Sequence, residues 1–278
     1  MTFIINHNIL FIMKITVNGK ELFIEKPLSI KNLILELNVD SDIFIANSFP
    51  VSLSYNIKNN DVITLIKKGS IPDKDYLEYQ LISRQGLKEY NILKNSSVAV
   101  CGLGGLGSNA AISLARAGVG SLKLIDFDIV EPSNINRQAY FIEHIGKNKT
   151  DALKEIINKI SPYINIETAN IYLDETNIIN ELSGFNVILE CFDNISSKMM
   201  LIEKCVNNMR DSYIIGASGV AGYYNTDKFT KKSLGSNCII IGDFENEAGF
   251  NQGLYAPRVT AAANIQANET IRYLLKDK

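Results

Sequence analysis

Hydrophobic and polar positions divide the chain into a short β-rich segment, a connection and a long segment of alternating strands and helices. Residues 14–17 alternate polar and apolar side chains, and the dipeptide Asn18-Gly19 that follows is a strong hairpin signal. Ser29 is a plausible helix N-cap before the apolar positions at 33, 34 and 37. The expected elements are strands at residues 14–17, 21–24, 43–46 and 62–66 and a helix at residues 27–37. This order predicts a small β domain over residues 13–68.

The long segment alternates short apolar strands with amphipathic helices. Gly69-Ser70-Ile71-Pro72 breaks the preceding strand. The helical signals that follow in residues 73–91 predict that residues 69–97 are a helical connection to the long segment. The expected strands are 97–101, 121–126, 166–172, 186–190 and 213–217, and the expected helices are 106–117, 151–160, 175–182, 196–209 and 259–275. Apolar strands separated by helices predict a mainly parallel sheet that is covered on both faces. Residues 228–256 look less regular, and we expect a mobile loop there. The fold class is therefore α/β, with residues 98–278 as the large domain.

The balance of charged residues argues against one class of function, the binding of nucleic acid. Lys and Arg total 28 and Asp and Glu total 30, which gives a formal net charge of −2. General nucleic-acid binders carry a basic stripe, so this balance argues against nucleic acid as a partner. No segment is long and apolar enough to suggest a membrane span. Residues 1–12 are a possible leader or a misassigned start, because a clean strand begins just after Met13. The scattered cysteines fit a reducing, cytoplasmic location.

The strongest local motif is GLGGLGS at residues 102–108, between an expected strand and an expected helix. Glycines let the backbone approach phosphates closely, and a helix N-terminus favours negative charge. The spacing of Gly102, Gly104 and Gly107, with Gly105 between them, fits a dinucleotide fingerprint, and Asp126 follows at the expected distance. The motif alone indicates an adenosine nucleotide, and a tight turn without a ligand is the alternative.

The residues after the next strands favour a triphosphate. Asp126 can accept from both ribose hydroxyls, and Arg137 can donate several hydrogen bonds to phosphate oxygens. Lys149 begins a helix from which it could reach a triphosphate, and Asp193 follows another apolar strand. The carboxyl ends of parallel strands meet at one crevice, so these side chains should converge there. A nicotinamide dehydrogenase would not need Arg137, Lys149 and Asp193, whereas ATP with Mg²⁺ would.

Four motifs together resemble the adenylating domain of the ubiquitin-activating superfamily, in particular its bacterial ThiF and MoeB type. They are GLGGLGS (102–108), DFDIVEPSNINRQ (126–138), GKNK (146–149) and FDN (192–194). The resemblance covers residues 98–278. Residues 131–150 and 253–259 are most similar to the zinc-free ThiF-like branch, the adenylyltransferases of the sulfur carrier ThiS in thiamine biosynthesis. The resemblance implies a Rossmann-like adenylating domain that binds ATP and Mg²⁺ and holds no zinc.

The resemblance also implies a role for individual residues. Asp126 and Asp128 would belong to the nucleotide site, with Asp126 on the ribose. Asn134 and Arg137 would contact the phosphates, Lys149 would neutralise the β- and γ-phosphates, and Asp193 would coordinate Mg²⁺. The family also uses an arginine from a partner subunit, for which Arg84 is the candidate, so we expect a homodimer. The reaction would be attack of a carrier's C-terminal Gly-Gly carboxylate on the α-phosphorus of ATP.

The cysteines depart from the pattern of many relatives, which carry two CxxC pairs for zinc or a cysteine that binds the carrier covalently. This chain has no CxxC pair. We expect Cys101, Cys191 and Cys205 to be buried, because free cysteine usually is. Cys238 is the one candidate for a reactive thiol.

Residues 13–68 resemble ThiS itself, which has a small β-grasp, ubiquitin-like fold. ThiS acts through a free C-terminal Gly-Gly, whereas here the chain continues through Lys67-Lys68-Gly69-Ser70. This segment therefore cannot be adenylated as it stands. We expect either a carrier-like domain that shapes the docking surface or the dimer, or a structural addition.

The main expectation is an enzyme that adenylates a ThiS-like sulfur carrier, with a sulfur donor such as a cysteine desulfurase as a further partner. One alternative is adenylation of another carrier, such as the small subunit of molybdopterin synthase, or of a tRNA base. A non-enzymatic alternative is a carrier-binding protein whose site is blocked by its own N-terminal domain. Arg137, Lys149 and Asp193 together argue against that last alternative.

Overall fold

The computed structural model describes residues 12–247, 249 and 253–276, which form two compact units. The first unit ends at Arg84 and the second begins at Gln85. The division therefore falls at the end of helix α2 (Lys74–Gln85), inside the segment 69–97 expected to connect the domains. Within the described part of the chain, no helix is long and apolar enough to cross a membrane.

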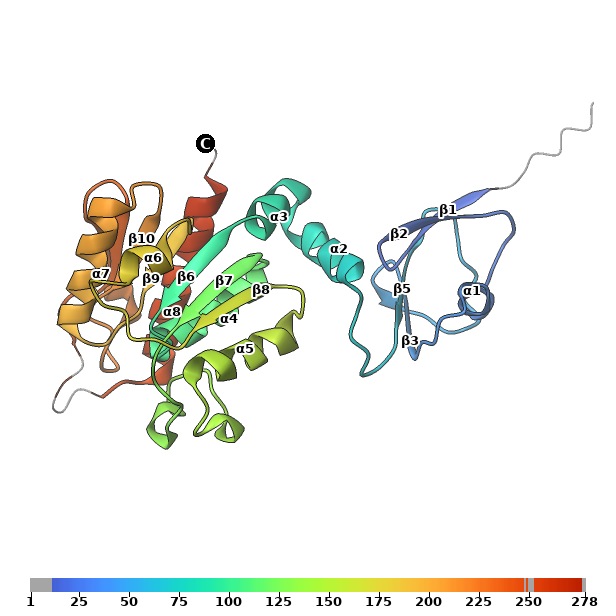
Figure 1. The fold of residues 1–278 in the computed structure, drawn as a ribbon. Helices are drawn as coiled ribbons and strands as arrows, with labels where there is room; N and C mark the ends of the chain where they lie inside the picture. Colours follow the sequence, from blue (N-terminus) through green and yellow to red (C-terminus); the bar gives the residue numbers. More distant parts are fainter. Residues whose placement is uncertain (1–11, 248, 250–252, 277–278) are drawn as a thin grey trace, which may run out of the picture. The chain divides into compact units, whose positions relative to one another are not determined.

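The N-terminal unit holds a mixed sheet and helix α1, and most of helix α2 follows at its end (Figure 1). Its elements are β1 (Met13–Val17), β2 (Lys20–Ile24), α1 (Ile30–Leu37), β3 (Ile43–Ala46), β4 (Phe49–Pro50) and β5 (Val62–Ile66). The strand order is β2-β1-β5-β3-β4, in which only the β1–β5 pair is parallel. Asn18 and Gly19 have φ angles of 46° and 81°, as the predicted two-residue hairpin requires. This arrangement confirms the predicted small β domain.

Helix α1 begins where the sequence predicts its cap. The Ser29 side chain accepts a hydrogen bond from the backbone N–H of Asn32, so the helix starts at Ile30, later than the predicted residue 27. Ile30 and Leu33 are fully buried against Ile15 and Ile63 of the sheet. The unit has its own apolar core, which gives it a basis for stability separate from the second unit.

The second unit is a Rossmann-like α/β sandwich, as predicted, and its sheet has seven strands where five were expected. Its strands are β6 (Ser97–Cys101), β7 (Ser121–Ile125), β8 (Asn165–Ala169), β9 (Val187–Glu190), β10 (Tyr213–Ala217), β11 (Thr230–Ser233) and β12 (Cys238–Gly242). The order is β11-β12-β10-β9-β6-β7-β8, and every pair is parallel except β11 with β12. The chain starts in the middle at β6 and builds outward on both sides, which places a switch point between β6 and β9.

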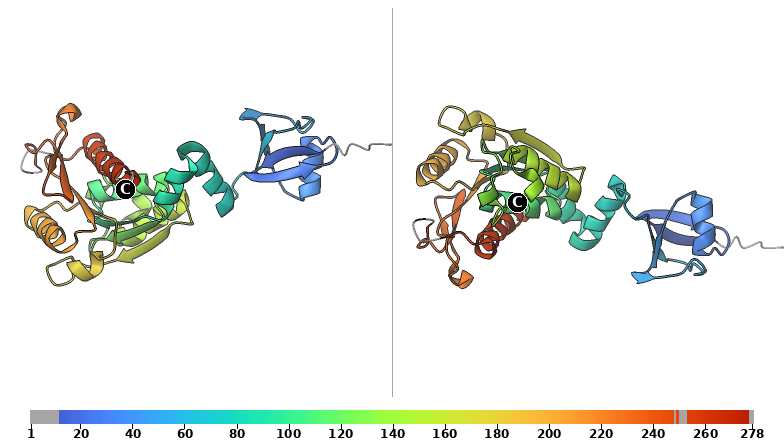
Figure 2. Two further views of the ribbon diagram at one scale, coloured as in Figure 1. Left: turned by 90° about the horizontal axis from the view of Figure 1, so that it is seen from above. Right: turned by 90° about the horizontal axis from the view of Figure 1, so that it is seen from below.

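Helices cover both faces of this sheet (Figure 2). They are α3 (Leu87–Lys94), α4 (Gly105–Ala117), α5 (Lys149–Ile160), α6 (Ile178–Leu182), α7 (Ile195–Asn208) and α8 (Ala256–Leu275). Val98 and Val100 of β6 face the core under α4, α5 and α8, whereas Ala99 and Cys101 face the core under α6 and α7. This alternation is the reason that the strand is apolar throughout.

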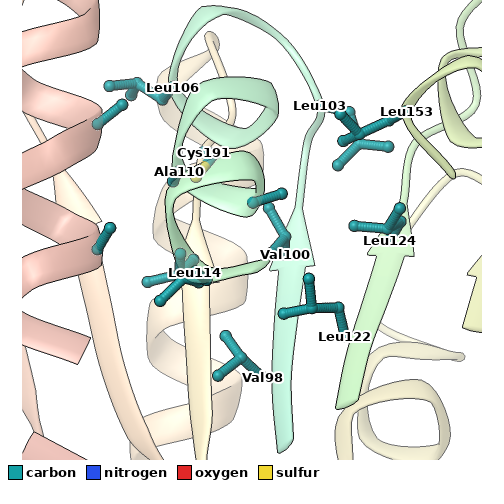
Figure 3. Packing of buried hydrophobic residues seen from close by; sticks show 14 of the residues in the cluster. Val98, Val100, Leu103, Leu106, Ala110, Leu114, Leu122, Leu124, Leu153 and Cys191 are labelled. Carbon is teal, nitrogen blue, oxygen red and sulfur yellow. The ribbon is translucent and has the colours of Figure 1, made fainter. Parts of the chain in front are cut away.

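Close packing fixes α4 against the sheet beneath it. Figure 3 shows Leu114 of α4 beside Val98 and Val100 of β6, within the larger apolar cluster. Gly107 lies at the closest approach, because a Cβ atom there would stand 1.9 Å from the carbonyl oxygen of Gly102. Gly107 is therefore required for packing of the helix on the turn before it.

The largest departure from prediction is in residues 228–256. This range holds two strands, β11 and β12, where an irregular region was expected. Part of the loop predicted there lies outside the described residues, as do residues 1–11 of the possible leader. Helix α6 is also shorter than predicted, because Asp174 accepts hydrogen bonds from the backbone N–H and hydroxyl of Thr176 and holds that segment in a turn.

Candidate active site

A cavity of about 1020 Å³ lies at the carboxyl ends of the parallel strands. Its walls come from the residues that follow β6, β7, β8, β9 and β10 and from the first turns of α4 and α7. This is the place where open α/β sheets bind ligands, beside the switch point of strand order. Its volume is at the upper end of the usual range for small-molecule sites, so it has room for a nucleotide.

The glycine-rich turn forms one wall of the cavity. Gly102, Gly104 and Gly105 line it, whereas Gly107 is buried beneath the turn. Gly102 has a φ of 88°, and a Cβ atom there would stand 2.9 Å from the carbonyl oxygen of Cys191. The turn therefore needs glycine for its conformation and for its contact with the neighbouring strand end. Three of the four predicted glycines face the cavity.

Asp126 connects the glycine turn to the end of β7. It is 8% exposed, and its carboxylate accepts hydrogen bonds from the backbone N–H groups of Leu103, at 2.6 Å, and Asp128, at 2.9 Å. A carboxylate has about four acceptor positions, so two of them remain for a ligand. Asp126 is positioned to accept hydrogen bonds inside the cavity, where the sequence placed it.

Lys149, the first residue of α5, lies almost buried in the same wall. Its Nζ atom is 2.7 Å from Oδ2 of Asp128 and 3.9 Å from Oδ2 of Asp126. The lysine side chain is 7% exposed, whereas that of Asp128 is 48% exposed. The structure thus brings Asp126, Asp128 and Lys149 together, with the cation between the two carboxylates.

Arg137 lines the cavity, but its predicted companion Asn134 does not. The Arg137 guanidinium donates to the carbonyl oxygen of Ser133 at 3.0 Å and to Oδ1 of Asn136 at 2.9 Å, both through Nη1. Asn134 is 7% exposed, and its Oδ1 accepts from the backbone N–H of Glu131. Asn134 thereby holds the turn that carries Arg137 in place.

Asp193 is an exposed residue of the loop between β9 and α7, and it lines the cavity. Among the described residues, its carboxylate has no hydrogen-bond or ion-pair partner. The described residues contain no group of three or more histidine, cysteine or acidic side chains that could hold a metal. A single free carboxylate fits Mg²⁺, which is usually held by one or two carboxylates together with water and substrate phosphates.

Two further residues that line the cavity, Gln138 and Lys198, were not predicted from the sequence. Gln138 lines it, is 8% exposed, and leaves Oε1 without a hydrogen bond among the described residues. Lys198 also lines it, and its Nζ lies 2.5 Å from Oε2 of the fully buried Glu190. A carboxylate that ends an apolar strand was the available signal for this pair, since buried acidic groups are nearly always paired.

All four cysteines are buried. Cys238 lies in β12 with 1% exposure, and burial raises the pKa of its thiol to about 11. The structure therefore gives no support to Cys238 as a candidate reactive thiol, because reactivity needs exposure and a lowered pKa. The expectation that Cys101, Cys191 and Cys205 are buried is confirmed.

Arg84, the candidate for a partner-subunit arginine, is exposed in the last turn of α2. It belongs to the N-terminal unit, whereas every other candidate residue belongs to the second unit. Its role in a second copy's site stays a prediction.

Comparison with known proteins finds one family for each of the two parts of the chain. The profile of the ThiF family matches residues 77–278, and that of ThiS-like ubiquitin matches residues 13–69. The molybdopterin-synthase adenylyltransferase of Haemophilus influenzae is 35% identical over 193 residues, which cover 66% of this chain and 76% of that protein. Its counterpart in Salmonella typhimurium is 30% identical over 209 residues, covering 73% and 84%.

Solved structures show the same fold at lower identity. The tRNA N6-threonylcarbamoyladenosine dehydratase of E. coli, solved in complex with AMP, has a TM-score of 0.67 at 19% identity. The alignment covers 74% of this chain and 97% of that one. The same enzyme was solved in complex with ATP, with a TM-score of 0.66. The family match and the two curated relatives described above show that the chain belongs to the ThiF family of adenylyltransferases and carries a ThiS-like ubiquitin domain before its adenylating domain.

Proposed function

We propose that this protein uses ATP to adenylate the C-terminal carboxylate of a separate sulfur-carrier protein. The proposal rests on one observation: a single cavity is lined by the glycine turn together with Asp126, Arg137, Lys149 and Asp193. Together they offer an acceptor for ribose, close backbone approach for phosphates, two cations and one free carboxylate. A nucleoside triphosphate with its metal ion would contact all of these groups at once.

The arrangement supports ATP at the level of individual atoms. Asp126 keeps acceptor positions for ribose hydroxyls after its two bonds to backbone N–H groups. Arg137 uses Nη1 for its two hydrogen bonds, which leaves Nε and Nη2 for phosphate oxygens. Lys149 has three N–H donors and one close carboxylate, so it can bind a phosphate while it still contacts Asp128.

In the proposed reaction, a carboxylate oxygen of the carrier's last glycine attacks the α-phosphorus of ATP. The bond from the α-phosphorus to the bridging oxygen breaks, and the products are the carrier acyl-adenylate and pyrophosphate. Arg137 and Lys149 stabilise the negative charge that grows on the phosphate oxygens, and the cavity aligns the two reactants. No side chain of this domain needs to form a covalent bond in that step.

Asp193 is the group that would hold Mg²⁺, which supplies positive charge to the phosphate oxygens when it is bound. The exposed, unpartnered carboxylate supports this assignment. Arg84 of a second copy would complete the site in a homodimer.

The carrier is the finer part of the proposal. The sequence motifs favour a ThiS-type carrier and thiamine biosynthesis, but the curated relatives at 35% and 30% identity are molybdopterin-synthase adenylyltransferases. These relatives favour the alternative, a carrier of the type of the small subunit of molybdopterin synthase. We therefore propose that type first, and the ThiS type second because of the fused ThiS-like domain.

The test is to incubate the purified protein with ATP, Mg²⁺ and each carrier and to search for the carrier acyl-adenylate by intact-protein mass spectrometry. We expect an adduct with one carrier, and none with the same carrier lacking its final glycine. Saturable ATP binding without any adduct would favour the non-enzymatic, carrier-binding alternative. Binding of NAD in place of ATP would overturn both.

A further inference from the structure

An ion pair between Lys198, which lines the cavity, and the fully buried Glu190 plays no part in the roles assigned so far. Glu190, the last residue of β9, is fully buried, and its Oε2 accepts a 2.5 Å hydrogen bond from Nζ of Lys198. The same Nζ donates to the carbonyl oxygen of Ala217, the last residue of β10, at 2.8 Å. The pair therefore ties the carboxyl ends of two neighbouring strands to the first turns of α7.

The strand beside the pair has a glycine next to it. A Cβ atom on Gly216 would stand 2.7 Å from Cδ1 of Ile240 and 3.0 Å from Oε2 of Glu190, so glycine in β10 leaves space for both side chains. On the other face, Nε2 of Gln266, in α8, donates to the carbonyl oxygens of Glu190 and Ile215. The end of β9 is thus held from both faces of the sheet.

The pair also fixes the loop that carries Asp193. Oε1 of Glu190 accepts a 2.8 Å hydrogen bond from the backbone N–H of Phe192, one residue before Asp193. One residue after it, Asn194 caps α7 by accepting from the backbone N–H of Ser197 at 2.7 Å. Asp193 lies between these two anchors, and its own carboxylate has no partner among the described residues.

Stability alone is a weak reason for such a pair. Replacing a buried ion pair by apolar side chains of similar size is often neutral or stabilising. Attraction of a triphosphate is a weak reason too, because the charge of Lys198 is balanced by Glu190 at hydrogen-bond distance. What the pair does provide is a fixed position for the loop from Cys191 to Asn194.

We propose that Glu190 and Lys198 are positioning residues, which hold the Asp193 carboxylate where it meets the metal–nucleotide complex. This inference rests on the proposed function for the identity of the ligand. Mutation of residues that hold a metal ligand in place commonly changes metal affinity 10- to 100-fold. Loss of either charge should therefore weaken the response of nucleotide binding to Mg²⁺, and should leave metal-free binding of ATP nearly unchanged.

The experiment measures the dissociation constant of ATP by calorimetry, with and without Mg²⁺, on the full chain without a carrier. For Lys198→Met and Glu190→Gln, we expect the gain in affinity that Mg²⁺ gives to fall about tenfold. Lys198→Arg keeps the charge and should keep most of that gain. Lys204→Met is the matched control, because Lys204 is on the same helix and pairs with the exposed Glu175 at 3.0 Å.

A double-mutant cycle separates positioning from general destabilisation. If the pair acts through Asp193, then Asp193→Asn combined with Lys198→Met should lose no more of the Mg²⁺ effect than the larger single change. Losses that multiply would overturn the proposal, as would a wild-type response to Mg²⁺ in a folded Lys198→Met protein. Should that variant fail to fold, the neutral pair Glu190→Gln/Lys198→Met replaces it and must show the same reduced response.

These outcomes are distinguishable from failure of the proposed function. The binding measurement needs no carrier, so it can support or overturn the role of the pair even when no acyl-adenylate forms. Failure of ATP to bind the wild-type protein would instead overturn both.

Discussion

The backbone N–H of Leu103 donates a 2.6 Å hydrogen bond to Oδ2 of Asp126. This bond joins the glycine turn after β6 to the end of β7, the strand beside it. The carboxylate that is proposed to bind ribose therefore also fixes the turn that is proposed to approach the phosphates. One side chain sets the position of two parts of the nucleotide site.

Asp126→Ala should weaken ATP binding about 10- to 100-fold. The reason is the loss of hydrogen bonds to a charged acceptor, worth about 1.5–3 kcal/mol, together with the loss of the bond to Leu103. Calorimetric titration with ATP measures the change. Asp227→Ala, an acidic side chain in the exposed turn 226–228, is the control and should bind ATP normally. Equal affinity of the Asp126 variant and the wild type would contradict the assignment.

Lys149→Met should reduce the kcat/KM for adenylation about 100-fold, because it removes a nearly buried cation beside the expected phosphates. Lys147→Met is a matched control. Lys147 lies two residues away, but its side chain is 43% exposed and pairs with Glu155. Steady-state kinetics of pyrophosphate release compares the two variants. Similar losses in both would show that the position of Lys149 has no special importance.

Gly107→Ala should lower the free energy of unfolding by about 1–3 kcal/mol, as overpacked positions usually do. The new Cβ atom would stand 1.9 Å from the carbonyl oxygen of Gly102. Gly104→Ala is the control, since its Cβ would meet nothing closer than Nε2 of Gln138 at 3.9 Å. Thermal or urea unfolding checks the difference. A Gly107 variant as stable as the wild type would mean that helix α4 can move away from the turn at little cost.

The four thiols should react slowly with a disulfide reagent at pH 8 in the native protein and quickly after denaturation. All four are buried. Burial raises the pKa of Cys238 to about 11 and that of Cys205 to about 12, and it raises the pKa values of Cys101 and Cys191 as well. A raised pKa leaves little thiolate at pH 8, and thiolate is the reactive form. One thiol that reacts at the rate of a free peptide would point to an exposed nucleophile.

Much of the fold could be predicted because its elements are local patterns. The Asn18-Gly19 hairpin and the Ser29 cap each depend on neighbours in the sequence, and both are confirmed. Strands β11 and β12 were missed because no α-helix separates them from β10 or from each other, so the strand–helix alternation that marked the other strands is absent there. The side chains of β11 are all exposed, and β12 is buried throughout. Only pairing with β10 and with each other defines them as strands.

In the candidate site, too, some residues could be placed from the sequence and others only from the fold. Residues that end strands, such as Asp126 and Asp193, could be placed in one cavity from topology alone. Asn134 could not be separated from Arg137, because only the fold shows which of the two side chains turns inward to hold the backbone. The position of Glu190 at the end of an apolar strand indicates that it needs a partner, but only the fold shows that the partner is Lys198, which also donates to Ala217 on another strand.

ATP–pyrophosphate exchange would show directly whether this protein adenylates a carrier. It would be run with Mg²⁺, with each carrier in turn and without any carrier, on the wild type and on Arg137→Ala and Asp193→Ala. We expect exchange that depends on a carrier with a free Gly-Gly end and that is lost in both variants. Exchange that is absent with both carriers despite ATP binding, or that persists in both variants, would contradict the proposed function.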